Sequence, residues 1–203
     1  MVNAGVIPLD ANVEIVHRDK FGNVKPIFQE NLLCIKLMKS GFLSPLWING
    51  MMSAVMSPFL GHWTLAKDGS NLITTVGKAA AASRINGSGA EAAFTSIGQG
   101  TGTTAANVAD TALETGKLAD GTGDSGVHVL PTASVTASRV TTTVTNDTAQ
   151  LLGTISETAT MAITESGVFN ANTNGVMIAR QVFTAINVVN GDSLQFTWKI
   201  KAA

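Results

Sequence analysis

The sequence is poor in charged and aromatic side chains. Asp, Glu, Lys and Arg make up only 13% of its 203 residues, about half the usual share in a soluble domain. Tyr is absent, and aromatic residues account for 5% of the chain. Sugar-binding sites usually stack the sugar on exposed aromatic rings, so this scarcity disfavours a lectin.

The chain also lacks clustered cations and paired cysteines. Its formal net charge is -1, and no run of Lys or Arg occurs. This argues against specific nucleic-acid binding, because such grooves use clustered cations to displace counterions. Cys34 is the single cysteine, so no disulfide can form within the chain. We expect its thiol to be buried and unreactive, because it lies in an apolar run without a cationic neighbour.

A stretch without charged residues runs from Ser40 to Ala66 and is long enough to span a bilayer. Two prolines and an Asn-Gly turn would interrupt a single helix there. Burial in a protein assembly is therefore favoured over insertion into a membrane.

Seven apolar side chains from this stretch are candidates for a subunit interface. Thioether and aromatic groups adapt well to a partner surface. The helical spacing of the methionines equally fits a stripe that faces the core of the same chain. The candidates are Trp47, Met51, Met52, Val55, Met56, Phe59 and Trp63.

No pattern in the sequence supports catalysis or the binding of a metal or cofactor. The three histidines lie in different segments, without the second ligand at short spacing that a metal site needs. The glycine-rich run from Gly98 to Thr104 lacks the Gly-Lys-Ser/Thr ending of a phosphate-binding loop. Glu157 and Glu165 would work as an acid–base pair only if their environments separated their pKa values. We therefore expect no enzymatic activity, no cofactor and no metal.

Alternating apolar residues and turn signals predict a mainly-β fold. We expect a C-terminal antiparallel β-sandwich, preceded by an extended arm with short helical segments. Three parts are predicted: an N-terminal arm and apolar anchoring segment (1–66), a short helix and hinge (67–90), and the sandwich domain (91–203). The predicted strands of the sandwich are 92–97, 134–145, 149–158, 161–169, 176–188 and 194–201.

The region before the sandwich contains a hairpin and a helix. Residues 13–28 predict two short strands around a turn at 19–23, and Pro26 confines the second strand to a sheet edge or to its own start. Residues 72–85 contain strong helix formers, and Asn86-Gly87-Ser88-Gly89 ends that helix.

Glu165 and Arg180 interrupt two apolar strands of the predicted sandwich. A charge buried without a partner is strongly destabilising, so we expect the two side chains to pair with each other. Such a cross-strand pair would fix the register of the two strands.

Several short segments between about residues 70 and 203 follow one another in a characteristic order. They are Asn71 to Gly77, Gly100 to Ala105, Asp110 to Glu114, Thr164 to Asn170, Ala179-Arg180, Phe183 and Gly191 to Ile200. This ordered set resembles small virion proteins of tailed bacteriophages, described as head-decoration, fibre or tail-associated proteins. In those proteins the strand that precedes the Gly-Thr-Gly loop usually carries bulkier side chains than it does here. The resemblance implies a β-sandwich module of the virion without catalytic residues.

The expected function is that of a capsid decoration or cement protein, located in a virion that assembles in the cytoplasm of the bacterial host. Its expected partners are the major capsid protein or other virion proteins, together with sister copies of the chain. The alternative is a tail, neck or fibre protein that acts in tail assembly or host adsorption.

Overall fold

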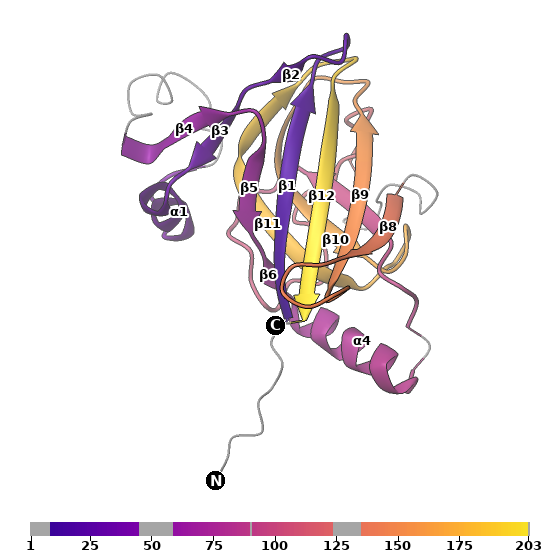
Figure 1. The fold of residues 1–203 in the computed structure, drawn as a ribbon. Coiled ribbons are helices and arrows are strands. Elements are labelled where there is room, and N and C mark those ends of the chain that lie inside the picture. Colours follow the sequence, from indigo (N-terminus) through magenta and orange to yellow (C-terminus); the bar gives the residue numbers. More distant parts are fainter. Residues whose placement is uncertain (1–8, 45–58, 90, 124–134, 203) are drawn as a thin grey trace.

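The computed structural model describes residues 9–44, 59–89, 91–123 and 135–202, in which two large antiparallel sheets pack face to face and a third sheet has two strands (Figure 1). The mainly-β prediction is confirmed. The first sheet has the strand order β2-β1-β12-β9-β8, and β5 also pairs with β1. Its strands are β1 Leu9–Arg18, β2 Val24–Lys25, β5 Lys67–Ser70, β8 Val135–Val140, β9 Thr148–Ser156 and β12 Ser193–Ala202.

The second sheet has the order β6-β11-β10-β7. Its strands are β6 Leu72–Ile73, β7 Ser96–Gly100, β10 Met161–Phe169 and β11 Met177–Val188. The predicted ranges of β9, β10, β11 and β12 match the structure within two residues at each end.

The core lies between the two sheets and is built from alternate residues of their strands. Val13 and Ile15 of β1 are buried there, as are Ile163 of β10 and Phe183 of β11. Trp198 of β12 is fully buried, and its indole N–H donates to Ser166 Oγ on the opposite sheet at 3.3 Å. This bond satisfies the polar atom of the largest core side chain and ties the two layers together.

The predicted division of the chain into arm, hinge and sandwich does not follow the sheet topology. The strand β1 pairs with β12 along its whole length, from Leu9↔Ala202 to Arg18↔Ser193. The segment predicted as an arm therefore supplies an inner strand of the first sheet. The segment predicted as a hinge supplies β5 and β6, which pair with β1 and β11. An alternating strand buries one face, but its sequence does not identify which distant strand will pair with it.

The predicted hairpin is present as β1 and β2, with His17 opposite Lys25. The Asp19 carboxylate accepts the backbone N–H groups of Phe21 and Asn23 at 2.8 and 2.9 Å, which holds the turn. Because β2 lies at the sheet edge, the lack of an N–H in the Pro26 that follows it leaves no gap in the sheet.

The predicted strand 134–145 is too long, because β8 ends at Val140. The residues after it form a turn around the Asp147 carboxylate, which accepts the backbone N–H groups of Thr142, Thr143 and Val144, each at 2.9 Å. Local hydrogen bonds to one carboxylate therefore override the β propensity of this threonine run.

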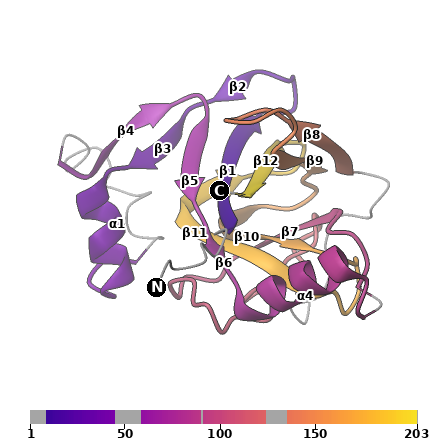
Figure 2. The same cartoon turned by 60° about the horizontal axis from the view of Figure 1, so that its bottom comes forward.

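The predicted helix is α4, Thr75–Asn86, and it packs on β11 at one end of the sandwich (Figure 2). It starts later than predicted because Leu72 and Ile73 form β6. The Thr74 hydroxyl caps the helix by accepting the N–H of Gly77 at 3.0 Å. Gly87 ends the helix in the left-handed conformation, with φ +68°.

Candidate interaction surface and buried polar clusters

A small lobe lies beside the sandwich, at the left in Figure 1, and is built from β3 Ile27–Glu30, α1 Leu32–Lys39 and β4 Gly61–Thr64. β3 and β4 form their own two-stranded antiparallel sheet. The lobe has a separate core, made of Phe28, Cys34, Leu43 and Leu60. Burial raises the pKa of the Cys34 thiol to about 11, so the thiol is inert at neutral pH.

Asn31 connects the helix of the lobe to its sheet. Its side-chain oxygen accepts the N–H of Cys34 at 3.0 Å, which caps α1. Its side-chain amide donates to the Phe59 carbonyl at 2.6 Å. One residue thereby fixes the start of α1 against the chain that enters β4.

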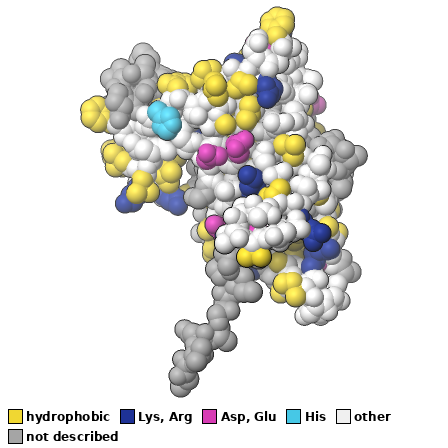
Figure 3. Space-filling view, viewed as in Figure 1, with side chains coloured by type: hydrophobic (Ala, Val, Ile, Leu, Met, Phe, Trp, Pro, Cys, Tyr) yellow, Lys and Arg dark blue, Asp and Glu magenta, His cyan; other side chains and the backbone are white. Residues whose placement is uncertain are grey.

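The surface of this lobe is unusually apolar. Six of the twelve exposed large apolar side chains in the described part of the chain belong to it, with exposed fractions between 49% and 74%. Figure 3 shows apolar side chains over this part of the molecule, at the upper left. We call these six residues the lobe patch: Leu32, Leu33, Phe42, Phe59, Trp63 and Leu65.

The lobe patch contains Phe59 and Trp63, two of the seven predicted interface residues. The Trp63 ring packs edge-on against Phe28, with centroids 5.8 Å apart, so one part of the indole is anchored while another part faces solvent. The other predicted residues, Trp47, Met51, Met52, Val55 and Met56, lie outside the described residues. Sequence reasoning missed the four other members of the patch, because an apolar residue type does not show whether the fold leaves the side chain exposed.

Glu165 and Arg180 are in direct contact under the outer face of the second sheet. Arg180 Nε donates to Glu165 Oε2 at 2.9 Å, and both residues are buried. Arg180 Nη1 also donates to Asp110 at 2.7 Å. In the sheet register Glu165 lies opposite Val182, and Arg180 lies opposite Gly167, so the pair is diagonal across the two strands.

The Glu165 carboxylate also holds the long loop that follows β7. It accepts the backbone N–H groups of Gly102, Glu114 and Thr115 at 3.0, 3.1 and 2.8 Å. These three bonds come from a loop with little regular structure, and the donor at Gly102 is buried. The pair therefore fastens this loop to the sheet, in addition to the register role expected from the sequence.

A second polar cluster surrounds Asp192, where β1 ends and β12 begins. Asp192 Oδ2 accepts hydrogen bonds from His17 at 2.8 Å and from Lys25 at 2.9 Å. Burial opposes ionisation of Asp192, but these bonds outweigh it and lower its pKa. Burial lowers the pKa of His17, although Asp192 opposes this effect.

Next to this cluster, Glu157 and Gln99 are both 1% exposed, and their side-chain polar atoms form no hydrogen bond within the described chain. Burial raises the pKa of Glu157 to about 7. The nearby Gln99 amide lowers this pKa, whereas the negative charge of Asp192 raises it further. In the register of β7 and β10, Gln99 lies opposite Ser166. The Ser166 hydroxyl accepts from Trp198 in the core, so the Gln99 side chain also points into the sandwich. Glu165 lies one residue along β10 and therefore on the opposite face. Glu157 lies beside Gln99 on the inner side of the sheet and Glu165 lies on the outer side, so these two glutamates cannot form an acid–base pair.

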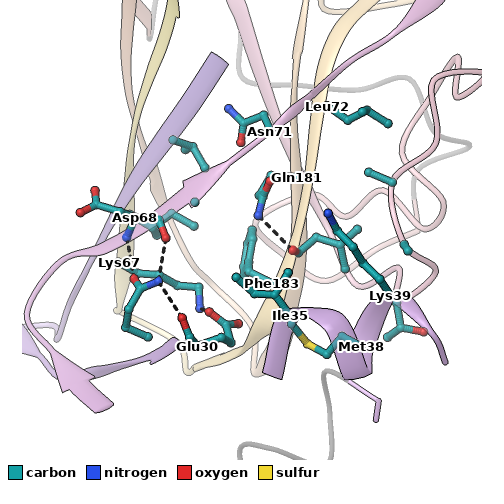
Figure 4. A pocket seen from close by; sticks show the side chains of 18 residues that line it. Glu30, Ile35, Met38, Lys39, Lys67, Asp68, Asn71, Leu72, Gln181 and Phe183 are labelled. Carbon is teal, nitrogen blue, oxygen red and sulfur yellow. Dashed lines mark hydrogen bonds and ion pairs between the residues drawn. The ribbon is translucent and has the colours of Figure 1, made fainter. Parts of the chain in front are cut away.

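A cavity of about 180 Å³ lies at the junction between the lobe and the sandwich (Figure 4). Met38 and Ile35 of α1 line one side, and Gln181 and Phe183 of β11 line another. Asn71 also lines it, and its amide atoms are buried with no hydrogen-bond partner within the described residues. The buried ion pair between Lys67 and Glu30 forms part of the wall. Sequence reasoning missed this pair, since Lys67 lies in the segment predicted as a short helix and hinge (67–90).

Within the described residues, no group of three or more His, Cys, Asp or Glu side chains is arranged to hold a metal ion. None of the helices described is both long and apolar enough to cross a membrane. No protein-family model, curated protein or solved structure matches the chain.

Proposed function

We propose that the protein is a structural component of a tailed-bacteriophage virion, which attaches to other particle proteins through the lobe patch. The observation that carries the proposal is the concentration of exposed apolar side chains on a small lobe beside a well-packed sandwich. Large exposed apolar patches mark interaction sites, because covering them removes apolar surface from water. The resemblance of residues 70–203 to virion proteins supports the choice of partner.

The size of the lobe patch favours a role in a repetitive lattice. Covering the exposed part of each large apolar side chain contributes about 1–2 kcal/mol. Six such side chains give about 6–12 kcal/mol, while association of two proteins costs about 4–15 kcal/mol. A single contact is therefore weak, and stable attachment needs repeated contacts among neighbouring copies. Capsid decoration or cementing supplies this repetition and is the role that we propose.

The alternative is a tail, neck or fibre protein. The observation in its favour is the loop from Thr101 to Gly123, which exposes two further apolar side chains, Val108 and Leu118. In this role the loop would contact a tail partner or the host surface.

Incorporation of variants into particles tests the proposal. Phe59→Ser and Leu65→Ser remove exposed apolar groups of the lobe patch and should leave the core intact. Together they are expected to lower the copy number per particle about tenfold or more. Ile85→Ser is the matched control, because Ile85 is 88% exposed but lies on α4. Normal incorporation of the double variant would refute attachment through the lobe.

Labelling of the protein on purified particles separates the two roles. Signal spread over the head, with a loss of heat resistance in particles that lack the protein, is the result expected for a cement protein. Signal confined to the neck or tail, with unchanged head stability, would replace it with the alternative.

A further inference from the structure

Lys67 and Glu30 meet in the interior, where the lobe joins the sandwich. Lys67 begins β5 of the first sheet, and Glu30 ends β3 of the lobe. The two residues are 2% and 7% exposed, and Lys67 Nζ is in direct contact with Glu30 Oε2 (Figure 4). Thr184 of β11 completes the cluster. Three separate elements therefore hold one amine against one carboxyl group, away from water.

The Lys67 amine contacts three oxygen atoms, one for each N–H group of its charged form. Besides Glu30, the nitrogen contacts two neutral acceptors, the Phe28 carbonyl at 2.8 Å and Thr184 Oγ1 at 3.0 Å. A neutral amine has two N–H groups and one lone pair. Once Glu30 has taken the third proton, those two acceptors hold the two remaining N–H groups, and the lone pair is left on the side of the Glu30 carboxyl. Burial lowers the pKa of Lys67, although the Glu30 charge opposes this effect.

The Glu30 carboxyl is held in a matching orientation. Its other oxygen, Oε1, accepts the backbone N–H of Thr184. A backbone donor at this position polarises the carboxyl carbon and stabilises the negative charge that would form on Oε1 if a nucleophile attacked that carbon. The same residue, Thr184, thus positions the amine through its hydroxyl and the carboxyl through its N–H.

The geometry points to a covalent amide crosslink between Lys67 Nζ and Glu30 Cδ, formed by the folded chain itself. Proton transfer within the pair gives a neutral amine and a neutral carboxylic acid. Nζ attacks Cδ and forms the new C–N bond, and the Cδ–Oε2 bond then breaks. Oε2 keeps the carboxyl proton, takes one proton from Nζ and leaves as water. No oxidant, reductant or further reactant is needed.

Two physical terms favour this condensation over a permanent ion pair. Fixed reacting groups reach effective concentrations of about 10⁵–10⁸ M, which offsets the unfavourable equilibrium of amide formation in water. The product is also neutral, so the desolvation penalty of burying two charges disappears. The adjoining cavity of about 180 Å³, which Lys67 and Glu30 both line, gives the released water a place to go.

The chain contains an internal comparison in the pair between Lys25 and Asp192. Its nitrogen–oxygen distance is 2.9 Å, but the Lys25 side chain is 38% exposed. Its amine is therefore open to water and is not enclosed by buried elements as the Lys67 amine is. Contact with a carboxylate alone is therefore not sufficient, and Lys25 is expected to remain unmodified.

Mass spectrometry of the intact, denatured protein tests the crosslink. The expected mass is lower than the sequence mass by one water molecule. After proteolysis, the peptides that contain Glu30 and Lys67 are expected as a single linked species. Lys67→Arg retains the positive charge but not the nucleophile, and it should have its full sequence mass. Lys25→Arg is the matched control and should still lack one water.

The wild-type mass decides the question even where the Lys67 variant folds poorly. A folded wild-type protein that keeps its full sequence mass after prolonged incubation would overturn the inference. A water loss that maps to a cyclic imide at Asp68-Gly69 or Asp120-Gly121 would overturn it as well. The inference does not depend on the proposed function, because particle incorporation and the mass of the chain are measured separately.

Discussion

Replacing Glu157 by Gln should make the protein more stable at alkaline pH. The Glu157 carboxyl is 1% exposed, and neither of its oxygens has a hydrogen-bond partner within the described residues. Burial raises its pKa from an ordinary value of 4.5 to about 7. Gln has nearly the same shape as the protonated acid and cannot ionise, so the variant keeps the favourable form at every pH.

The magnitude follows from the change in pKa on folding. Because the folded protein binds this proton more tightly than the unfolded chain, the stabilisation is complete below pH 4.5 and is lost as the pH rises through 7. One pKa unit corresponds to about 1.4 kcal/mol, so between pH 5 and pH 8 the wild type should lose about 2–3 kcal/mol that Glu157→Gln retains. Asp192 is present in both proteins, and its charge contributes to the raised pKa of Glu157.

The assay is chemical denaturation of the wild type and the variant at several pH values between 5 and 8. The difference in unfolding free energy should grow with pH, in favour of Glu157→Gln. Glu14→Gln is a suitable control, because that carboxylate is partly exposed on β1. A free-energy difference that stays constant across this pH range would show that Glu157 is not a buried acid that titrates near neutrality.

Two further predictions concern packing and the long loop. Arg180→Met leaves the Glu165 carboxylate buried without its cation and should destabilise the fold by about 3 kcal/mol. It should also speed tryptic cleavage after Lys117 in the loosened loop, whereas unchanged cleavage would refute the fastening role. Gly77→Ala should destabilise the fold, measured by thermal melting, because its new Cβ would lie 2.4 Å from Ile178 Cα. A stabilised variant would instead show that helix propensity outweighs this clash.

Local signals in the sequence determined the strands and the helix. Alternation between turns such as Asn190-Gly191-Asp192 located β9 to β12, because the side-chain period of a strand and the conformational freedom of glycine are local properties. The cap residues of α4 are equally local, and Gly87 ends the helix at the predicted turn. The pairing of Glu165 with Arg180 followed from the high free energy of a single buried charge.

Only the tertiary structure decided which distant segments meet. The pairing of β1 with β12 joins the two ends of the described chain, and no local pattern specifies a partner at that separation. The turn at Asp147 is different, because it is local: one carboxylate outweighs the β propensity of residues three to five positions before it. The cluster of Lys67, Glu30 and Thr184 depends on three elements converging, and burial changes the chemistry of groups that would be ordinary in water. Sequence therefore determined the strands β9 to β12 and the end of α4, and packing determined which charged groups lost their solvent.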